Sequence, residues 1–481
     1  MSVVESNPNL LQPEERVLST LERDGSRRWL RPKLAPGRYL TRRRVVAYLL
    51  IAIFTVTPYL KVRGKPVILL DVVHRRFTLM GVTFLPTDMM FLALFMVSLI
   101  LSIFLLTALL GRVWCGWACP QTVYMEFLFR PLERLFTGRT GVGGKPKGQV
   151  AAWRLVLMYA TYFLASFYLA HTFLSYFVGV EALRHWVFGS PTDHIAAFVI
   201  VVFVTVMMLF NFGFFREQTC IIACPYGRLQ SVLLDKSSLI ISYDKRRGEP
   251  RGAIRRTSLP VVEAEKKGDC VDCDMCVSVC PTGIDIREGL QIECVACAQC
   301  IDACDTVMKK VGRATGLIRY SSQSAMAGEK TRMLRPRVII YPSVLLVLVS
   351  ILAFLLATRA PADVAVMRGL GLPFVTMPDG GIENTLRVKL TNRTDHAMRL
   401  NVSVVGRQDV VVSAADRTVD LAVGQSLLQP VHLVAPPRAF TLGFLDVTLR
   451  VSGEDGTVID RTCRLLGPMK HEAEEHEHDG H

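Results

Sequence analysis

The sequence lacks the features that identify secreted proteins, c-type haem proteins and nucleic-acid-binding proteins. Residues 1–43 are polar and basic and lack the short apolar run and cleavage site of a secretory signal, so we expect the first apolar stretch to be retained as a helix. There is no C-x-x-C-H motif, which excludes haem attachment through that motif. No nucleic-acid-binding motif accompanies the formal net charge of +14, and we therefore expect no nucleic acid partner.

Cysteine outside closely spaced motifs is almost absent. The 481 residues include thirteen cysteines, and only Cys463 stands apart from the others. Close spacing of this kind is typical of metal sites and differs from the pattern of a disulfide framework. We therefore predict that the clustered cysteines bind metal ions or iron–sulfur clusters.

Charged residues are also few, at 20% of the chain, whereas 51% of the residues are hydrophobic. The apolar residues concentrate in five segments that approach or exceed the roughly 20 residues needed to cross a bilayer. These predicted spans are residues 44–60, 87–111, 154–177, 194–215 and 338–357. The first is the shortest, because Pro58 lies near its end.

Lysine and arginine are distributed unevenly between these spans. The segment 216–337 carries twenty of them, whereas 178–193 carries one and 61–86 carries five. Because Lys and Arg collect on cytoplasmic loops, we predict that the N-terminal segment 1–43 and the domain at 216–337 are cytoplasmic. With five spans, the C-terminal domain then lies on the opposite side of the membrane.

Residues 361–469 have a different pattern from the spans. Stretches such as 385–390 and 446–451 alternate apolar and polar residues, which is the period of a half-buried strand. Several such runs separated by Gly, Asp and Pro predict an all-β sandwich of the immunoglobulin type. The last residues, 470–481, are acidic and histidine-rich, and we expect them to be disordered.

Two copies of the spacing C-x2-C-x2-C-x3-C lie in the predicted cytoplasmic domain. In two-cluster ferredoxins the fourth cysteine of each motif binds the other cluster. We therefore predict two 4Fe–4S clusters, the first held by Cys270, Cys273, Cys276 and Cys304 and the second by Cys294, Cys297, Cys300 and Cys280. A pair of zinc knuckles is the alternative, but zinc sites use two pairs of ligands and leave this spacing unexplained.

A second type of motif, C-x3-C-P, follows the second and fourth predicted spans. Its cysteines are Cys115, Cys119, Cys220 and Cys224. A spacing of four residues places both sulfurs of a pair on one helical face, and the proline favours a helix break. Two such pairs brought together offer four soft ligands, which select Cu(I), zinc or an iron–sulfur cluster. Packing of small cysteines at helix ends is the alternative, and the matched prolines argue against it.

Other possible ligands are less specific. Methionines in the second and fourth spans could bind copper, but methionine in an apolar helix usually packs in a core. His171, His185 and His194 lie near the ends of the third and fourth spans, where interfacial histidine is common. The histidines of 470–481 could hold Cu(II) or zinc loosely, and a solvated tail is the favoured interpretation.

Taken together, the motifs resemble those of the FixG/RdxA-type accessory proteins of cbb-type cytochrome c oxidase. The resemblance covers nearly the whole chain and is most specific in Trp-Cys-Gly-Trp-Ala-Cys-Pro-Gln-Thr at 114–122 and Cys-Ile-Ile-Ala-Cys-Pro-Tyr-Gly-Arg at 220–228. It implies a multi-domain protein of the bacterial inner membrane. That protein has an α-helical bundle of five spans, an inserted two-cluster ferredoxin-like α+β domain and a periplasmic immunoglobulin-like sandwich.

The resemblance also implies a role in oxidase assembly, with reduction of Cu(II) to Cu(I) for the oxidase copper centre. The eight downstream cysteines then receive electrons from an unidentified cytoplasmic donor, and the four C-x3-C-P cysteines carry the copper or redox chemistry. Expected partners are the membrane and the oxidase or its assembly factors, and a homodimer is an open alternative. Two other functions stay open, namely an assembly scaffold with structural clusters and a quinol-linked electron conduit. A third cluster or another metal at the C-x3-C-P cysteines also stays open.

Overall fold

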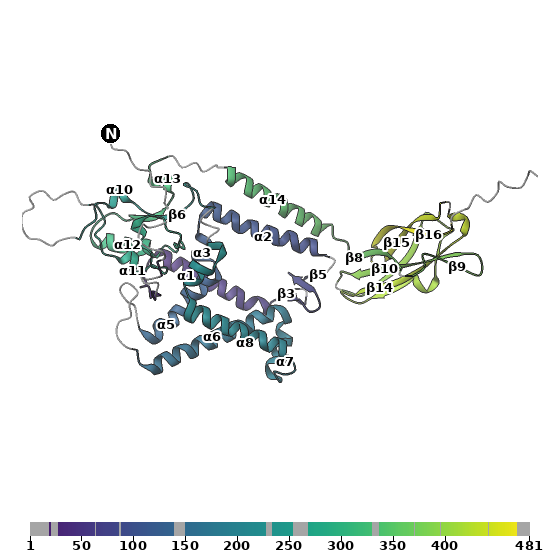
Figure 1. Ribbon diagram of the computed structural model, residues 1–481, viewed down its shortest axis with the longest axis horizontal. Helices are drawn as coiled ribbons and strands as arrows, with labels where there is room; N and C mark the ends of the chain where they lie inside the picture. The colour runs from purple at the N-terminus through teal and green to yellow at the C-terminus, as the bar shows by residue number, and fades with distance from the viewer. Residues whose placement is uncertain are drawn as a thin grey trace, which may run out of the picture. The chain divides into compact units, whose positions relative to one another are not determined.

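The computed structural model describes residues 19–20, 27–62, 64–85, 88–138, 150–227, 233–253, 268–329, 336–369, 371–394, 396–440 and 442–468. Its elements divide into two compact units, one of residues 1–70 and 94–350 and the other of residues 71–93 and 351–481. Figure 1 labels the elements of both units, which are considered separately below.

The first unit contains the helices around the candidate site. They are α1 (Arg38–Val56), α3 (Val113–Trp117), α4 (Pro120–Tyr124), α5 (Arg130–Thr137), α6 (Ala152–Val178), α7 (Val180–Phe188) and α8 (Ile195–Leu209). Helices α2 (Met89–Leu110) and α14 (Pro336–Ala357) belong partly to each unit. Helix α6 packs along α8 through Ala170, Leu174 and Val201, because the apolar residues of both helices face one another there.

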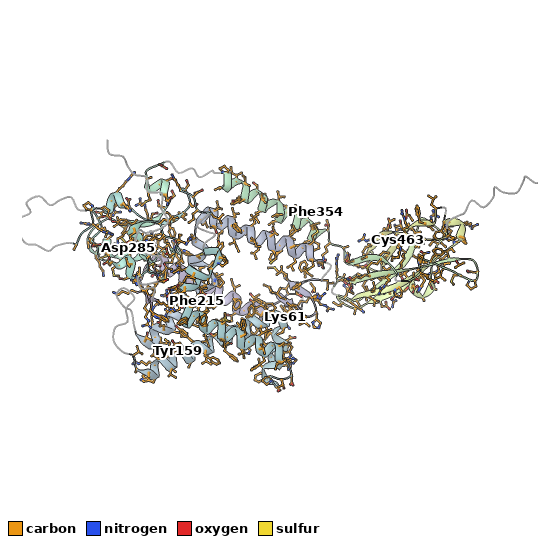
Figure 2. The ribbon with its side chains drawn as sticks, in the orientation of Figure 1. Lys61, Tyr159, Phe215, Asp285, Phe354 and Cys463 are labelled. Atoms are coloured by element: carbon orange, nitrogen blue, oxygen red, sulfur yellow. The ribbon has the colours of Figure 1, made fainter. Side chains whose placement is uncertain are left out.

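Four helices in the described part of the chain are long and apolar enough to cross a membrane. They are Met89–Leu110, Ala152–Val178, Ile195–Phe215 and Val338–Ala357, and they match the second to fifth predicted spans. Phe354 projects from α14 with 66% of its surface exposed, as a lipid-facing side chain does (Figure 2). The first predicted span overlaps α1, whose early turns carry Arg42, Arg43 and Arg44. The count of five spans therefore stays a prediction.

The described residues between 233 and 329 form a small α+β domain within the first unit. Strand β6 (Ile240–Tyr243) pairs antiparallel with β7 (Ile318–Ser321). The helices of the domain are α10 (Lys245–Gly248), α11 (Met275–Ser278), α12 (Gln299–Lys310) and α13 (Gln323–Met326). Ile241, Ile301 and Leu317 form its core together with several of the motif cysteines, so the apolar core and the cysteine loops are one structure.

Short strands occupy the segment between α1 and α2. They are β1 (Lys61–Val62), β2 (Lys65–Pro66), β3 (Ile68–Asp71), β4 (Arg76–Leu79) and β5 (Val82–Phe84). Within the second unit, β4 pairs antiparallel with β5. Asp88, at the end of this segment, is buried and binds Arg359 at 2.6 Å and Arg393 at 2.9 Å. These ion pairs attach the segment to the residues that follow α14.

The rest of the second unit is a two-layer β-sandwich, as the alternating pattern predicts. One sheet has the order β12-β14-β10-β8, with β9 paired to β10, and the other has the order β13-β11-β15-β16. The strands are β8 (Ala362–Arg368), β9 (Val375–Thr376), β10 (Ile382–Asn392), β11 (Met398–Val405), β12 (Val411–Val412), β13 (Thr418–Leu421), β14 (Ser426–Ala435), β15 (Phe444–Gly453) and β16 (Val458–Leu466). Cys463 lies on β16, partly buried against the sandwich core (Figure 2).

Candidate functional site

The two cysteine loops of the α+β domain follow the same backbone path. Asp272 and Asp274 in the first loop have φ of 51° and 53°, and Ala296 and Ala298 in the second have φ of 54° and 60°. In each loop these are the second and fourth residues after the first cysteine. Left-handed backbone is strained in residues other than glycine and collects at ligand-binding turns. The repeat therefore indicates that both loops are shaped to direct cysteines toward an enclosed ligand.

One cavity collects cysteines from both motifs. It is lined by Cys270, Cys273 and Cys276 of the first motif and by Cys304 of the second, and it holds about 360 Å³ of space free of protein atoms. Cys273 is exposed, whereas the other three cysteines are buried. Arg287 lines the same cavity. The four cysteines are those assigned to the first cluster, hence we call this space the first cavity.

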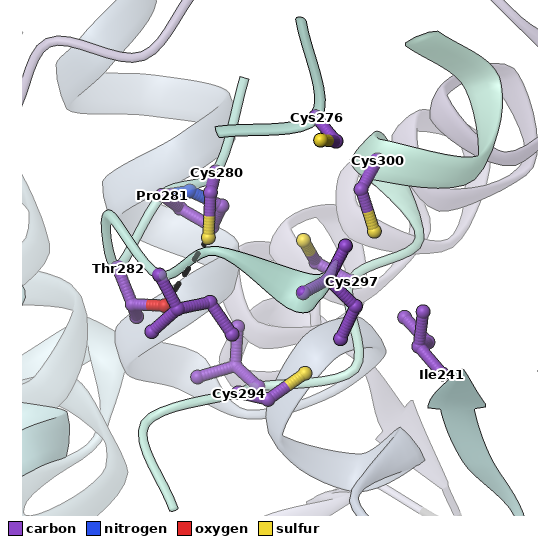
Figure 3. Close-up of a pocket in the computed structure, with 11 residues that line it drawn as sticks. Ile241, Cys276, Cys280, Pro281, Thr282, Cys294, Cys297 and Cys300 are labelled. Carbon is purple, nitrogen blue, oxygen red and sulfur yellow. Dashed lines mark hydrogen bonds between the residues drawn. The ribbon is translucent and has the colours of Figure 1, made fainter. Parts of the chain in front are cut away.

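A second cavity contains the remaining four cysteines. Cys280, Cys294, Cys297 and Cys300 line about 330 Å³ of space, and Figure 3 shows the sulfurs of Cys280, Cys297 and Cys300 directed toward it. The hydroxyl of Thr282 lies 3.4 Å from the Cys280 sulfur. Cys276 lines both cavities, so the two spaces adjoin. Each cavity thus brings together cysteines from both motifs, and the crossed assignment of ligands to clusters stays a prediction.

Burial strongly affects the cysteine thiols at both cavities. It is the largest cause that raises the pKa of Cys276, Cys297 and Cys304 to about 12 and that of Cys294 to about 11. These thiols are therefore protonated at neutral pH without a metal, and metal binding must release their protons.

The donor set fits a 4Fe–4S cluster better than a single ion. Each cavity is lined by at least four cysteine sulfurs, and four is the number that such a cluster binds. Among the residues that the structure describes, no group of three or more His, Cys, Asp or Glu side chains has the geometry for one metal ion. A cluster needs sulfurs farther apart, because each cysteine binds a different iron. The spacing and the donor set therefore favour a cluster over the zinc-knuckle alternative at each cavity.

The C-x3-C-P motifs do not keep both cysteines on one helical face, so this part of the prediction is wrong. Helix α3 ends before Cys119, whose backbone is extended with φ −61° and ψ 127°. Cys220 lies in a π-helical turn at Thr219–Ala223, and Cys224 after it is extended with ψ 110°. Proline disfavours helical backbone at the residue that precedes it, and in both motifs that residue is the second cysteine.

The four C-x3-C-P thiols nevertheless come close together. Burial, followed by the neighbouring thiols of Cys119, Cys115 and Cys224, raises the pKa of Cys220 to about 12. Burial also raises the pKa of Cys119, while backbone N–H groups at the start of α4 donate to its sulfur and oppose that shift. The structure therefore gathers the four sulfurs, from motifs about a hundred positions apart, into one neighbourhood.

The first C-x3-C-P motif packs directly against the loop of the second cavity. Gly116 approaches this loop so closely that a Cβ atom would lie 2.5 Å from the Val295 carbonyl oxygen. The indole N–H of Trp117 donates to the Tyr320 hydroxyl at 3.2 Å, and that hydroxyl donates to the Ala296 carbonyl at 2.7 Å. These contacts fix the two groups of cysteines relative to each other.

A buried ion-pair network beside Cys220 was not predicted from the sequence. Arg216 binds Glu133 at 2.9 Å and Arg130 binds Glu217 at 3.3 Å, and all four side chains are at most 8% exposed. The partners are 83 and 87 positions apart in the chain. Charged residues within an apolar segment could have indicated that buried ion pairs exist. Which residues pair, however, depends on how the helices pack.

Two of the three histidines considered as ligands, His171 and His194, have other contacts. The Nδ1–H of His171 donates a hydrogen bond to the Phe167 carbonyl at 2.9 Å, and its ring contacts the Phe167 ring. His194 stacks on Trp186 with ring centroids 4.0 Å apart. These contacts favour a packing role. The histidines of the 470–481 segment lie outside the described residues.

Comparison with protein-family models locates iron–sulfur domains on the cysteine motifs. A model described as a 4Fe-4S dicluster domain matches residues 215–323, and one described as a 4Fe-4S binding domain matches residues 92–139. All of the clustered cysteines lie within these two matches. A third model, described as the IG-like fold at the C-terminal of FixG, matches residues 352–468, which contain the β-sandwich.

Comparison with curated proteins gives relatives that span most of the chain. Protein RdxA of Cereibacter sphaeroides is 33% identical over 88% of this chain and 93% of its own length. Protein RdxB of the same organism is 32% identical over 84% of this chain and 88% of its own length. The nitrogen fixation protein FixG of Rhizobium meliloti is 32% identical over 79% of this chain and 80% of its own length.

Proposed function

The chain belongs to the family of FixG and RdxA, and from this premise we propose that it carries electrons from a cytoplasmic donor to copper during assembly of cbb-type cytochrome c oxidase. In this proposal the chain is a membrane-bound 4Fe–4S protein and Cu(II) is its substrate. Each Cu(II) takes one electron and becomes Cu(I), which is handed to the oxidase copper centre.

The proposed cluster ligands are the two sets of cysteines that share a cavity. Cys270, Cys273, Cys276 and Cys304 hold the first cluster, and Cys280, Cys294, Cys297 and Cys300 hold the second. Exposure of Cys273 supports electron entry at the first cavity, because a donor can approach it from solvent. Cys276 borders both cavities, so the clusters adjoin and electrons can pass from the first to the second.

The observation that carries the proposal is the contact of the first C-x3-C-P motif with the second cavity. Gly116 and Trp117 belong to the Cys115–Cys119 motif and touch the loop that contains Cys294 and Cys297. Such a contact supports a further thiolate group next to the proposed second cluster. A scaffold with structural clusters does not need this arrangement, whereas an electron path requires it.

Copper is proposed to bind at Cys115, Cys119, Cys220 and Cys224, because thiolates stabilise Cu(I). One observation favours a second candidate, in which these cysteines hold a third iron–sulfur cluster. The 4Fe-4S binding model at 92–139 covers Cys115 and Cys119 but none of the eight cysteines of the two cavities. The chain is then a three-cluster conduit, and the acceptor lies outside it.

The topology remains a proposal of five spans in the bacterial inner membrane. Val45, Tyr48, Leu49 and Ile53 of α1 are all more than half exposed, which supports contact with lipid. The N-terminus and the α+β domain are then cytoplasmic, and the sandwich is periplasmic. Reporter fusions near residues 290 and 420 should therefore indicate opposite sides of the membrane.

The experiment replaces each C-x3-C-P cysteine by serine in the full chain, purified anaerobically. Serine exchanges a soft ligand for a hard one, so we expect each variant to lose Cu(II) reduction and copper binding together. Iron should stay at about eight atoms per chain, four for each cluster. Cys463→Ser is the matched control, because Cys463 lies in the sandwich.

Two results would contradict the copper proposal. Reduction of Cu(II) at the wild-type rate by the serine variants shows that these cysteines are not the copper site. A fall from about twelve to about eight iron atoms per chain shows that they hold a third cluster.

A further inference from the structure

Five arginines are buried in the described part of the chain, and they differ in what neutralises them. They are Arg43, Arg112, Arg130, Arg216 and Arg287. The last three form ion pairs with glutamate or aspartate side chains. Pairing of this kind is expected, because a buried charge without an opposite charge nearby is strongly unfavourable.

Arg43 and Arg112 are the exceptions. Within the described ranges, neither has a carboxylate within ion-pair distance, and Glu293 acts on Arg112 only from farther away. One guanidinium nitrogen of each, Nη2 of Arg43 and Nε of Arg112, is buried without a hydrogen-bond partner among those residues. Phe127 lies 5.3 Å from the Arg43 guanidinium and contributes only a neutral ring. No described carboxylate therefore pairs directly with either charge, and Glu293 acts on Arg112 only from beyond ion-pair distance.

The contacts of Arg43 connect the second cavity with the C-x3-C-P thiols. Its Nε donates to the Gly116 carbonyl, between Cys115 and Cys119, at 2.8 Å. On its other side, the guanidinium lies close enough to Cys297 to oppose the rise in the pKa of that thiol that burial causes. Arg43 thus lies between a cysteine of the second cavity and the first C-x3-C-P motif.

Arg112 has the same relation to both groups. In the second loop it donates to the carbonyl of Ile292 and, at 3.2 Å, to that of Cys294. Beside the second C-x3-C-P motif it donates to the carbonyl of Gly227 at 2.9 Å. Burial lowers the pKa of Arg112, and the thiols of Cys294 and Cys115 act in the opposite direction. Two buried cations, neither of them in a direct ion pair with a described carboxylate, therefore lie between two groups of four cysteines.

We propose that Arg43 and Arg112 are positioning residues whose charges are balanced by the anionic metal–thiolate centres on either side of them, and that they raise the reduction potential of the second cluster relative to the first. This proposal rests on one part of the proposed function, namely that the cysteines hold redox centres. Reduction adds one negative charge, and a nearby cation in a region of low dielectric favours it. One electron is transferred, and no covalent bond forms or breaks.

The test is a potentiometric titration of the anaerobic full chain, followed by electron paramagnetic resonance and carried out without copper or quinone. The signals are assigned to the two clusters with the variants Cys304→Ala and Cys280→Ala. Arg43→Gln and Arg112→Gln remove the charge, whereas Arg43→Lys and Arg112→Lys keep it. Arg44→Gln is the matched control, because Arg44 follows Arg43 in α1 and is exposed.

For each Gln variant we expect the reduced-to-oxidised ratio of the second cluster at a fixed potential to fall about tenfold, which is a shift of about 59 mV to more negative potential. The Lys variants and Arg44→Gln should titrate as the wild type does, and the first cluster should not shift in any of them. Wild-type potentials in both Gln variants would overturn the proposal, as would equal shifts of both clusters.

Loss of iron is also informative. If the Gln variants lose the second cluster and the Lys variants keep it, the positive charge is needed to hold the centre, which supports the proposal. If Lys and Gln variants lose it equally, the arginines act through their hydrogen-bond geometry, and the proposal is wrong. Neither result depends on Cu(II) reduction, so this test and that of the proposed function can fail separately.

Discussion

The two cavities have the same cysteine spacing but different surroundings. At the first, Cys273 is exposed, and the lining Arg287 binds Asp272, Asp274 and Asp285 at 2.6–2.7 Å. At the second, none of the four cysteines is exposed. The nearby arginines there have no ion-pair partner among the described residues.

Under the proposed function, this difference would let one motif serve two positions in an electron path. Hydrogen bonds, burial and local charge set the potential of an iron–sulfur cluster, so equal ligands do not imply equal potentials. At the first cavity carboxylates pair with the buried arginine. At the second we propose that a cluster balances the cations. Electrons are therefore expected to enter at the exposed cavity and move to the buried one.

The largest expected effect comes from breaking the crossed grouping of cysteines. Cys304→Ala should remove the first cluster and leave the second, because Cys304 lines the first cavity although it belongs to the second motif. Cys280→Ala should do the reverse. Each variant should lose about four of about eight iron atoms. Iron analysis and the spectrum of the surviving cluster measure this, and loss of the cluster nearer in sequence would refute the crossing.

The next variant tests whether contact with the C-x3-C-P motif distinguishes the second loop. In Gly116→Ala the added Cβ would meet the backbone oxygens of Val295 and Ala296 at 2.5 Å and 2.8 Å. Such overpacking typically costs about 1–3 kcal/mol, and it should push the motif away from the loop. We expect Cu(II) reduction to fall at least tenfold while iron stays bound.

Gly189→Ala is the control for this variant, because the nearest atoms to its added Cβ are 3.6 Å away. Rates of single-turnover Cu(II) reduction by the pre-reduced protein compare the two. An unchanged rate in Gly116→Ala would show that the close contact does not serve electron transfer.

The sequence predicted features that depend on neighbouring residues, and it did not predict features that depend on packing between distant segments. The division of the eight cysteines between two clusters stays a prediction from their spacing. Alternation at 385–390 and 446–451 was enough to predict strands β10 and β15, because that pattern is local. Arg43 could not be distinguished from Arg42 and Arg44 in the basic run, since its burial follows from packing against Gly116. Pro120 predicted a helix break, but the break falls before Cys119 rather than after it, because proline also disfavours helical backbone at the residue that precedes it.

A smaller effect is expected at the edge of the first cavity. Burial acts to raise the pKa of Asp285, but hydrogen bonds from Arg287 outweigh it and the pKa is lowered. A carboxylate with a lowered pKa contributes stability above its unfolded pKa of about 4, and that stability is lost as the pH falls through the folded value. Arg287→Gln removes the hydrogen bonds, so the first cluster should be lost at higher pH than in the wild type.

Removing one partner of a buried ion pair typically lowers the free energy of unfolding by about 3–5 kcal/mol. This value is an upper limit for Arg287→Gln, because the side chains of Asp272 and Asp274 are 47% and 64% exposed. Stepwise acidification, followed by the signals of both clusters, measures the effect. The second cluster provides the internal reference. Equal acid sensitivity of the first cluster in wild type and variant would show that Arg287 does not protect it.

The smallest expected effect concerns a single hydroxyl group at the second cavity. The Thr282 hydroxyl lies 3.4 Å from the Cys280 sulfur, and it must be the donor once that sulfur is a thiolate ligand. A hydrogen bond to a ligand sulfur stabilises the more negative, reduced state. Thr282→Val should therefore lower the potential of the second cluster by less than about 59 mV, which is less than a tenfold change in the reduced-to-oxidised ratio.

The other motif offers a matched control for this variant. Thr306 stands two residues after Cys304, as Thr282 stands two residues after Cys280, but its hydroxyl donates to the Asp302 carbonyl at 2.7 Å. Thr306→Val should therefore leave the potential of the first cluster unchanged, since no bond to sulfur is lost. Equal shifts in both variants would mean that the hydroxyl acts through packing rather than through its bond to sulfur, and the two cavities would then differ in charge and exposure alone.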